Sequence, residues 1–257
     1  TPPCRAKDFL AISRDNGCVE IRDVNEKLRV VVTVAGYRNK PVNILAWTCS
    51  HSLAGSVAQI PNLVGGSRDG SLFIIDSSSG SMRGMTQSGG GGVFALVSLC
   101  QRHSCEGACC QLVAAGCEDG SIRIYQVQAE QESLILVSTV PSAGAAVLSL
   151  AWVRQRSAGS HESSIFAGVA DGTIRRYDFH GQLSKTDGLL GTWKSSIRMT
   201  VESLGRSTPT RVWALEGLAD GTIISADSLG HVQFWDGKTG TLEQSFDQND
   251  NKADVLG

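Results

Sequence analysis

The 257-residue sequence is poor in several features that would point to particular classes of protein. It contains only 6 prolines, and its formal net charge is −2, so no general positive field would draw the chain to nucleic acid or to an anionic membrane. No apolar run approaches the roughly 20 residues that a membrane-spanning helix needs. The opening segment, TPPCRAKDFL, has neither an initiator methionine nor an apolar signal segment, and indicates an excerpt or a processed product.

Glycine, in contrast, is abundant, with 29 residues separated by short β-branched runs. This composition predicts many tight turns that join short strands. One pattern of strand, glycine turn and strand recurs five times along the chain. The copies are SRDNGCVEIRD (13–23), SRDGSLFIID (67–76), CEDGSIRIYQ (117–126), VADGTIRRYD (169–178) and ADSLGHVQFWD (226–236).

The glycines of these copies lie 53, 50, 52 and 58 residues apart, at Gly17, Gly70, Gly120, Gly172 and Gly230. An Asp-Gly pair between two alternating strands predicts a hairpin turn with positive φ at the glycine. A further apolar strand precedes most copies and another follows each of them. Four antiparallel strands in about 50 residues are typical of a β-propeller blade, so we expect an all-β propeller.

We expect one partial propeller over residues 1–257. Its blades should span about 1–40, 42–87, 93–140, 147–201 and 212–247, with residues 253–257 at the start of a further blade. Because the chain opens on a segment that aligns with a second strand, the first blade should be incomplete. Propellers of this kind usually close with seven blades, so we expect these five to belong to a larger, seven-bladed ring.

The dipeptide Trp235-Asp236 resembles the pair that names the WD-repeat family, and the Asp-containing turns resemble its repeats. The matching repeat positions are Asp69, Asp119, Asp171, Asp227, Trp235 and Asp236. The sequence departs from the family because only one blade has Trp-Asp and no blade opens with Gly-His. The buried hydrogen-bond network of the family should therefore be incomplete, and apolar packing should carry more of the stability.

The segment Gly237-Lys238-Thr239 invites a second interpretation, the end of a phosphate-binding loop. Such a loop needs a glycine five positions before the Gly-Lys-Thr, and Val232 stands there. The residues that follow alternate like a strand instead of forming a helix. The segment is therefore predicted to be a turn between two strands.

Within the WD-repeat family, several stretches resemble nucleolar proteins of the small-subunit processome. They are GGVFALVSL, LVAAGCEDGSIRIYQV, VLSLAW, IRMTVE and RVWALEGLADGTIISADSLGHVQFWDGKTGTL. The resemblance implies a non-enzymatic scaffold in the nucleolus of the nucleus, with other processome proteins and pre-ribosomal RNA as partners. The alternative is another WD-repeat adaptor, such as a ubiquitin-ligase substrate receptor or a signalling hub.

The candidate for contact with RNA or a partner is the most basic stretch of the chain, TWKSSIRMTVESLGRSTPTR. Its cations are Lys194, Arg198, Arg206 and Arg211. A local cluster of this kind can bind phosphate groups with an affinity that falls with salt. A solvated loop and strand with outward cations remain the alternative interpretation.

Enzymatic and metal-dependent functions find little support. Ser13-Arg14-Asp15 begins like a sialidase box, but Cys18 and Val19 follow where that box ends in Thr-Trp. The five histidines lie in separate segments without a recognisable nucleophile motif. The segment Cys100 to Cys110 has irregular spacing for zinc and favours a thiol-rich loop. We therefore expect no catalytic residue, cofactor or metal.

Overall fold

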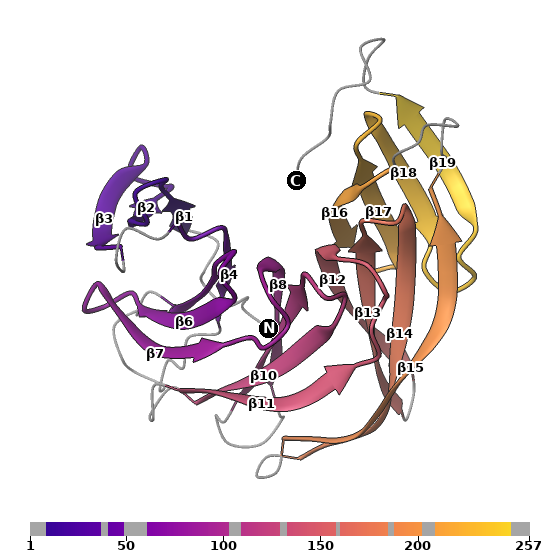
Figure 1. The fold of residues 1–257 in the computed structure, drawn as a ribbon, viewed down its shortest axis with the longest axis horizontal. Helices are drawn as coiled ribbons and strands as arrows, with labels where there is room; N and C mark the ends of the chain where they lie inside the picture. The colour runs from indigo at the N-terminus through magenta and orange to yellow at the C-terminus, as the bar shows by residue number, and fades with distance from the viewer. Residues whose placement is uncertain are drawn as a thin grey trace. The chain divides into compact units, whose positions relative to one another are not determined.

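The structure, a computed structural model, describes residues 9–36, 41–48, 61–102, 109–128, 133–157, 160–184, 188–201 and 209–247. These residues form five antiparallel sheets and contain no helix. The part of the chain described therefore offers no helical segment with the length and apolarity to cross a membrane. The predicted all-β class is confirmed, and the five sheets are the blades of a β-propeller (Figure 1).

The chain divides into two compact units. The first consists of Thr1–Ala115 and Ile124–Val137, and the second of Gly116–Arg123 and Ser138–Gly257. The first two blades lie in the first unit, the last two lie in the second, and the third blade contributes residues to both.

The strands of the first three blades follow chain order within each sheet. Blade 1 has β1 (Phe9–Ser13), β2 (Val19–Asp23) and β3 (Arg29–Val34), and blade 2 has β4 (Ile44–Trp47), β5 (Leu63–Gly66), β6 (Ser71–Asp76) and β7 (Ser81–Gln87). Blade 3 has β8 (Val93–Arg102), β9 (Cys109–Cys117), β10 (Ile122–Gln128) and β11 (Ser133–Val140). Blade 1 thus has three strands among the residues described.

Blades 4 and 5 have four strands each, again in chain order. Blade 4 has β12 (Val147–Ser157), β13 (Ser160–Val169), β14 (Thr173–Ser184) and β15 (Gly188–Thr200). Blade 5 has β16 (Val212–Gly217), β17 (Thr222–Asp227), β18 (His231–Asp236) and β19 (Leu242–Asp247). In both blades the strands pair antiparallel with their chain neighbours.

The turn marked by the repeated glycine joins the second and third strands of a blade, and we call it the middle turn. All five of its glycines have positive φ, between 79° and 88°, as predicted. In each case the glycine N–H donates to the carbonyl three residues earlier, as from Gly70 to Ser67 at 3.1 Å. A side chain at such φ values is strained, which explains why glycine recurs here.

Apolar side chains fill the space between neighbouring blades. On β6, Leu72 and Ile74 belong to the core shared with blade 3, while Phe73 and Ile75 belong to the core shared with blade 1. All four side chains are buried. A strand covered on both faces is apolar at successive positions rather than alternating, and this is the pattern of LFII at residues 72–75.

Candidate interaction surface

The middle turns carry carboxylates that are already engaged by their own blade. Asp69, Asp119 and Asp171 each accept a hydrogen bond from the backbone N–H two residues later, at 2.8–3.1 Å. Asp171 also binds Arg175, with Nη2 of the arginine 2.7 Å from the carboxylate. Asp119 forms the same kind of pair with the arginine four residues later, and Nη2 of Arg123 lies 3.7 Å from its carboxylate. Asp119 and Asp171 are therefore each paired with an arginine of their own blade.

The electrostatics of these carboxylates follow from their contacts. Partial burial opposes ionisation of Asp171, but hydrogen bonds from Thr173 and Arg175 stabilise its charge, so its pKa lies below the ordinary value. For Asp119, partial burial raises the pKa and the hydrogen bonds from Ser121 lower it, and the net pKa also lies below the ordinary value. Both groups are therefore acceptors near neutral pH, not general acids.

Asp227 occupies a different place in its turn from the other repeat aspartates. It is the first residue of the middle turn of blade 5, and only 1% of its surface is exposed. Its carboxylate accepts from the N–H groups of Leu229 and His231, and its Oδ2 lies 3.2 Å from His231 Nδ1. The other ring nitrogen of His231 is 3.1 Å from Asp247 Oδ1 on β19. Sequence reasoning treated the histidines as separate, and missed this contact.

The basic candidates divide between two ends of blade 4. Arg198 lies near the end of β15, 3.8 Å from Asp171, and its side chain is 62% exposed. Arg211 precedes β16, beside Thr210, whose carbonyl borders the Gly172 turn. Lys194 lies four residues before Arg198 on β15 and pairs with the backbone of Asp178, toward the other end of the strand. Arg206 lies outside the described residues.

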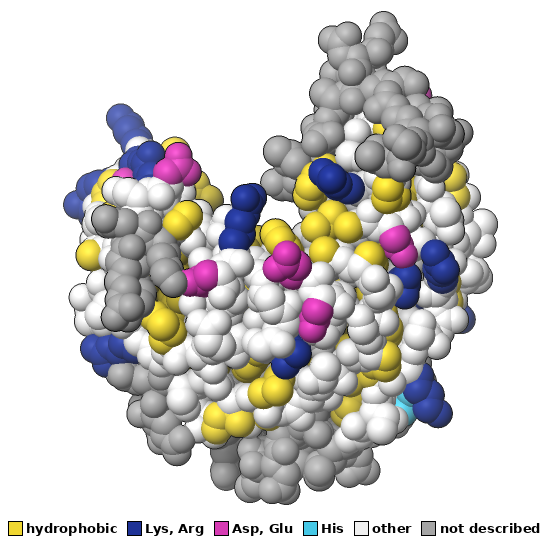
Figure 2. Space-filling model, in the orientation of Figure 1, with side chains coloured by type: hydrophobic (Ala, Val, Ile, Leu, Met, Phe, Trp, Pro, Cys, Tyr) yellow, Lys and Arg dark blue, Asp and Glu magenta, His cyan; other side chains and the backbone are white. Residues whose placement is uncertain are grey.

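Arg198 and Arg211 are thus the basic candidates at the same end of blade 4. The Arg211 guanidinium lies over the Trp213 ring, 5.6 Å from its centroid, and is exposed. Arg198 shares Asp171 with Arg175, which leaves one cation in excess at this turn. In Figure 2, Lys and Arg side chains are interspersed with Asp and Glu over the visible face.

The turn between the third and fourth strands, which we call the last turn, is built around an aspartate. In blade 5, Asp236 accepts from the N–H groups of Lys238 and Thr239 and from the Thr239 hydroxyl. These bonds lower the pKa of Asp236. Gly240 closes the turn with φ of 76°. Gly237-Lys238-Thr239 is therefore a turn between β18 and β19, as predicted from the sequence.

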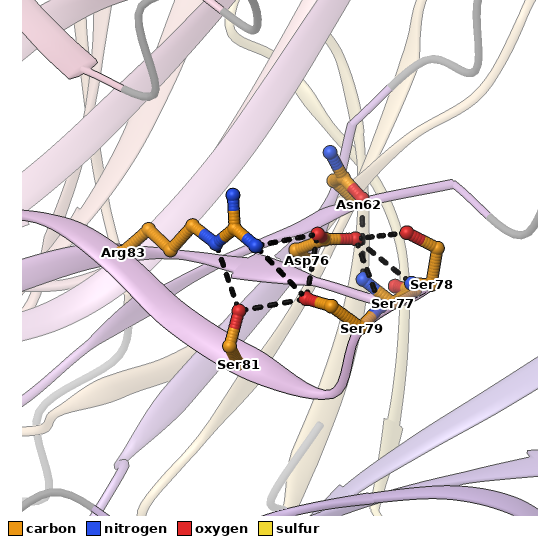
Figure 3. Close-up of polar contacts among 7 residues, drawn as sticks. All are labelled: Asn62, Asp76, Ser77, Ser78, Ser79, Ser81 and Arg83. Carbon is orange, nitrogen blue, oxygen red and sulfur yellow. Dashed lines mark hydrogen bonds and ion pairs between the residues drawn. The ribbon is translucent and has the colours of Figure 1, made fainter.

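The last turn of blade 2 has the same design with serines (Figure 3). Asp76 accepts from the hydroxyl and N–H groups of Ser78 and Ser79, and Arg83 lies 3.5 Å away. Ser77 is buried and donates its hydroxyl to the Pro61 carbonyl at 2.6 Å. Partial burial opposes ionisation of Asp76, but the serine hydrogen bonds prevail and lower its pKa to about 2.

Replacing Asp76 with asparagine should reduce stability near neutral pH and much less in acid. The folded-state pKa of Asp76 is below its unfolded value, so its contribution is present above about pH 4 and is lost as the pH falls through about 2. The loss near pH 7 should be about 1–2 kcal/mol. Urea unfolding at pH 7 and pH 2 measures it, with the exposed Asp15→Asn as the control. An equal loss at both pH values would contradict the role assigned to Asp76.

A buried arginine links blade 4 to the last turn of blade 5. Arg176 on β14 is 8% exposed, and its Nε donates to Asp178 at 2.7 Å. Its Nη1 donates to the Gly237 carbonyl at 2.9 Å, and its guanidinium lies 5.9 Å from the Phe166 ring centroid. The pKa of Asp178 is lowered, since hydrogen bonds from Ser164 and Arg176 outweigh partial burial. Arg176 thus supplies a donor to the Gly237 carbonyl and a second partner, beside Ser164, to the Asp178 carboxylate.

The residues described contain no group of three His, Cys, Asp or Glu side chains that could hold a metal ion. A pocket in blade 2 is lined by apolar Pro41, Val42, Phe73, Met82 and Met85 and by polar Ser67, Asp69 and Ser71, with no histidine or cysteine. Residues 103–108 of the cysteine-rich segment, and the side chains around them, lie outside the description.

The sequence was compared with protein-family models and with curated proteins, and neither comparison found a match. No protein-family model matches the sequence. No curated protein matches it either. The fold itself is a five-bladed, all-β propeller whose turns are consistent with a WD-repeat-like superfamily, and such propellers commonly serve as scaffolds because their rigid blades present variable loops.

Proposed function

We propose that the chain is a non-enzymatic scaffold of small-ribosomal-subunit biogenesis in the nucleolus. The observation that carries the proposal is the stretch Arg211 to Leu242, which resembles cirhin, a WD-repeat protein of the small-subunit processome. This resemblance covers more than a propeller strand or turn requires. It extends, with gaps at loops, over the preceding two blades from about Val93.

The chemistry of the blades supports a binding role over a catalytic one. The carboxylates of the middle and last turns are stabilised by their own hydrogen bonds, as at Asp171 and Asp76. A general acid or base needs a pKa near the working pH, and these contacts move the pKa away from it. Fixed turns on stiff sheets suit recognition of partner proteins, which here are the other proteins of the processome.

Affinity purification of the tagged chain, read by quantitative mass spectrometry, tests the proposal. An unrelated propeller with the same tag is the control for non-specific capture. We expect enrichment of processome proteins over this control. Enrichment of ubiquitin-ligase subunits or signalling proteins, with no processome protein among the captured set, would replace the proposal with the adaptor alternative.

Contact with pre-ribosomal RNA is a separate part of the proposal and has its own test. The basic variant carries glutamine in place of Lys194, Arg198, Arg206 and Arg211. The control variant carries glutamine at four other exposed cations, Lys27, Arg29, Arg68 and Lys238. Affinity for single-stranded RNA is measured as a function of salt in each. The slope of log affinity against log salt should become shallower by about 0.7 for each phosphate group that the basic variant no longer neutralises. Equal slopes in the two variants would remove RNA from the proposal.

A further inference from the structure

The pocket in blade 2 has no place in the function proposed above. All of its described lining residues lie between Pro41 and Met85, in the first compact unit. Phe73 on β6 is 4% exposed, and its side chain lies over Gly65 on the paired strand β5. A Cβ at Gly65 would clash with the Phe73 ring, so the glycine allows the ring to pack directly on the sheet. The pocket therefore has a fixed aromatic wall.

A β-bulge in the edge strand of blade 2 brings two methionines to the same pocket. The pairing of β6 with β7 shifts register between Leu72 and Ile74, so that Gly84 and Met85 together stand opposite Phe73. Gly84 has a φ of 59°, the left-handed conformation that glycine adopts at the first position of such a bulge. Both methionines of β7 line the pocket, and Met85 is 44% exposed. Their flexible, polarizable thioethers can adapt to a range of apolar partners.

The polar part of the lining is acidic, because Asp69 of the middle turn belongs to it together with two serines. Four residues after Asp69 stands Phe73, whereas blades 3 and 4 have Arg123 and Arg175 at this position, each paired with the aspartate of its own middle turn. Blade 2 thus has an aromatic ring where these blades have a guanidinium. The pocket combines apolar walls with a carboxylate, and none of its described lining residues is cationic.

The size of the pocket limits the class of ligand. Its space, part of which is open to solvent, is about 260 Å³. Pockets for cofactors and other small molecules usually measure about 300–1,000 Å³, so this one is small for such a ligand, whereas a single aliphatic side chain fits. Burial of that side chain against Phe73 and the methionines is favourable. A cation beside it would complement the charge of Asp69.

We propose that this pocket binds a short segment of a partner protein. One aliphatic side chain of the segment enters between Phe73 and the two methionines, and a neighbouring lysine or arginine lies beside Asp69. Apolar burial supplies most of the affinity, and the charge of Asp69 selects the sequence of the segment. The proposal does not depend on the processome assignment, because it requires only a partner that presents this pair of side chains.

Methionine methyl NMR of the full chain tests the proposal, because the sequence has 3 methionines and two of them line the pocket. The third, Met199, is 3% exposed in the core of blades 4 and 5 and is the internal control. The probe is the peptide Gly-Ser-Leu-Lys-Ser-Gly, blocked at both ends and added to millimolar concentration. We expect the methyl signals of Met82 and Met85 to shift progressively while that of Met199 stays in place.

Two matched peptides separate the apolar contribution from the charge. Serine in place of the leucine removes the buried side chain and should weaken binding about 10-fold. Glutamate in place of the lysine should weaken it about 2- to 5-fold, the range expected for an exposed ion pair. Failure of the leucine–lysine peptide to move the signals of Met82 and Met85 overturns the proposal. Equal shifts with the serine peptide also overturn it.

Asp69→Asn tests the role of the carboxylate without loss of the turn. Asn16 stands at the same position in blade 1, where its side-chain oxygen accepts from the N–H two residues later at 3.0 Å, as Asp69 does in blade 2. The variant should bind the lysine and glutamate peptides with equal affinity. Asp119→Asn, the same change in blade 3, is the control and should keep the preference for lysine. An unchanged preference in Asp69→Asn would overturn the assignment of the basic residue to this site.

Discussion

Replacing Trp235 with alanine is expected to lower the free energy of unfolding by about 3–5 kcal/mol. Trp235 is 4% exposed and packs in the core of blades 4 and 5 with Phe166, Ile174 and Ile223. Its Nε1 donates to the Ser225 hydroxyl at 2.9 Å. Removal of the ring leaves a large cavity between two sheets that are held in place by their own hydrogen bonds, so collapse around the site should be limited.

Equilibrium unfolding of the variant measures this loss, and two further variants divide it. Trp235→Phe keeps most of the ring but removes the hydrogen bond to Ser225, so its loss should be smaller than that of alanine. Phe246→Ala removes a ring that is 48% exposed on the same blade and should cost below about 1 kcal/mol. A loss below about 1 kcal/mol for Trp235→Ala itself would mean that the ring is not buried in solution.

The second large effect is expected for Arg176→Ala, with a loss of about 2–4 kcal/mol. The change leaves the Gly237 carbonyl without its donor and removes the guanidinium from Asp178. It also removes packing over Phe166. The expected loss is smaller than for a fully enclosed pair because the Asp178 side chain is 22% exposed and keeps its bond to Ser164.

Thermal or urea unfolding provides the measurement, and Arg29→Ala is the matched control. Arg29 also forms an ion pair, with Glu26 at 2.7 Å, but its side chain is 67% exposed. Exposed pairs contribute about 0–1 kcal/mol, so this variant should unfold much like the parent. If Arg176→Ala were no less stable than Arg29→Ala, the guanidinium would have no structural role between the blades.

The middle turns and the last turn of blade 5 were predictable because their cause is local. Positive φ at Gly70 follows from two short strands that must reverse within a few residues. The turn at Gly237-Lys238-Thr239 follows from the same reasoning, since no glycine stands at the position of Val232. Neither conclusion required knowledge of distant residues.

The buried polar contacts were not predictable, because they join residues far apart in the sequence. Arg175 and Arg176 are neighbours, and composition alone would place both in solvent; the structure exposes part of the first and buries the second against blade 5. In the same way, the pairing of His231 with Asp247 depends on the register of β18 and β19. The basic stretch was contiguous in sequence, but β15 carries Lys194 and Arg198 toward different ends of the blade.

The hydrogen bond from Arg176 to the Gly237 carbonyl predicts how these positions vary among related sequences. Arg176 donates to a main-chain carbonyl and not to a side chain, so the residue at Lys238 should be free to change. Gly237 should not be free to change. A Cβ at Gly237 would lie 2.5 Å from the Gly221 carbonyl oxygen. The chain already contains the comparison among its own repeats. In the other pairs of neighbouring blades, the position of Arg176 is isoleucine in the earlier blade, at Ile21, Ile74 and Ile124. The position of Gly237 in the later blade of each pair is Ser77, Val127 and Phe179, so glycine occurs only where the earlier blade has arginine. Arginine at the first position and glycine at the second should therefore be inherited together.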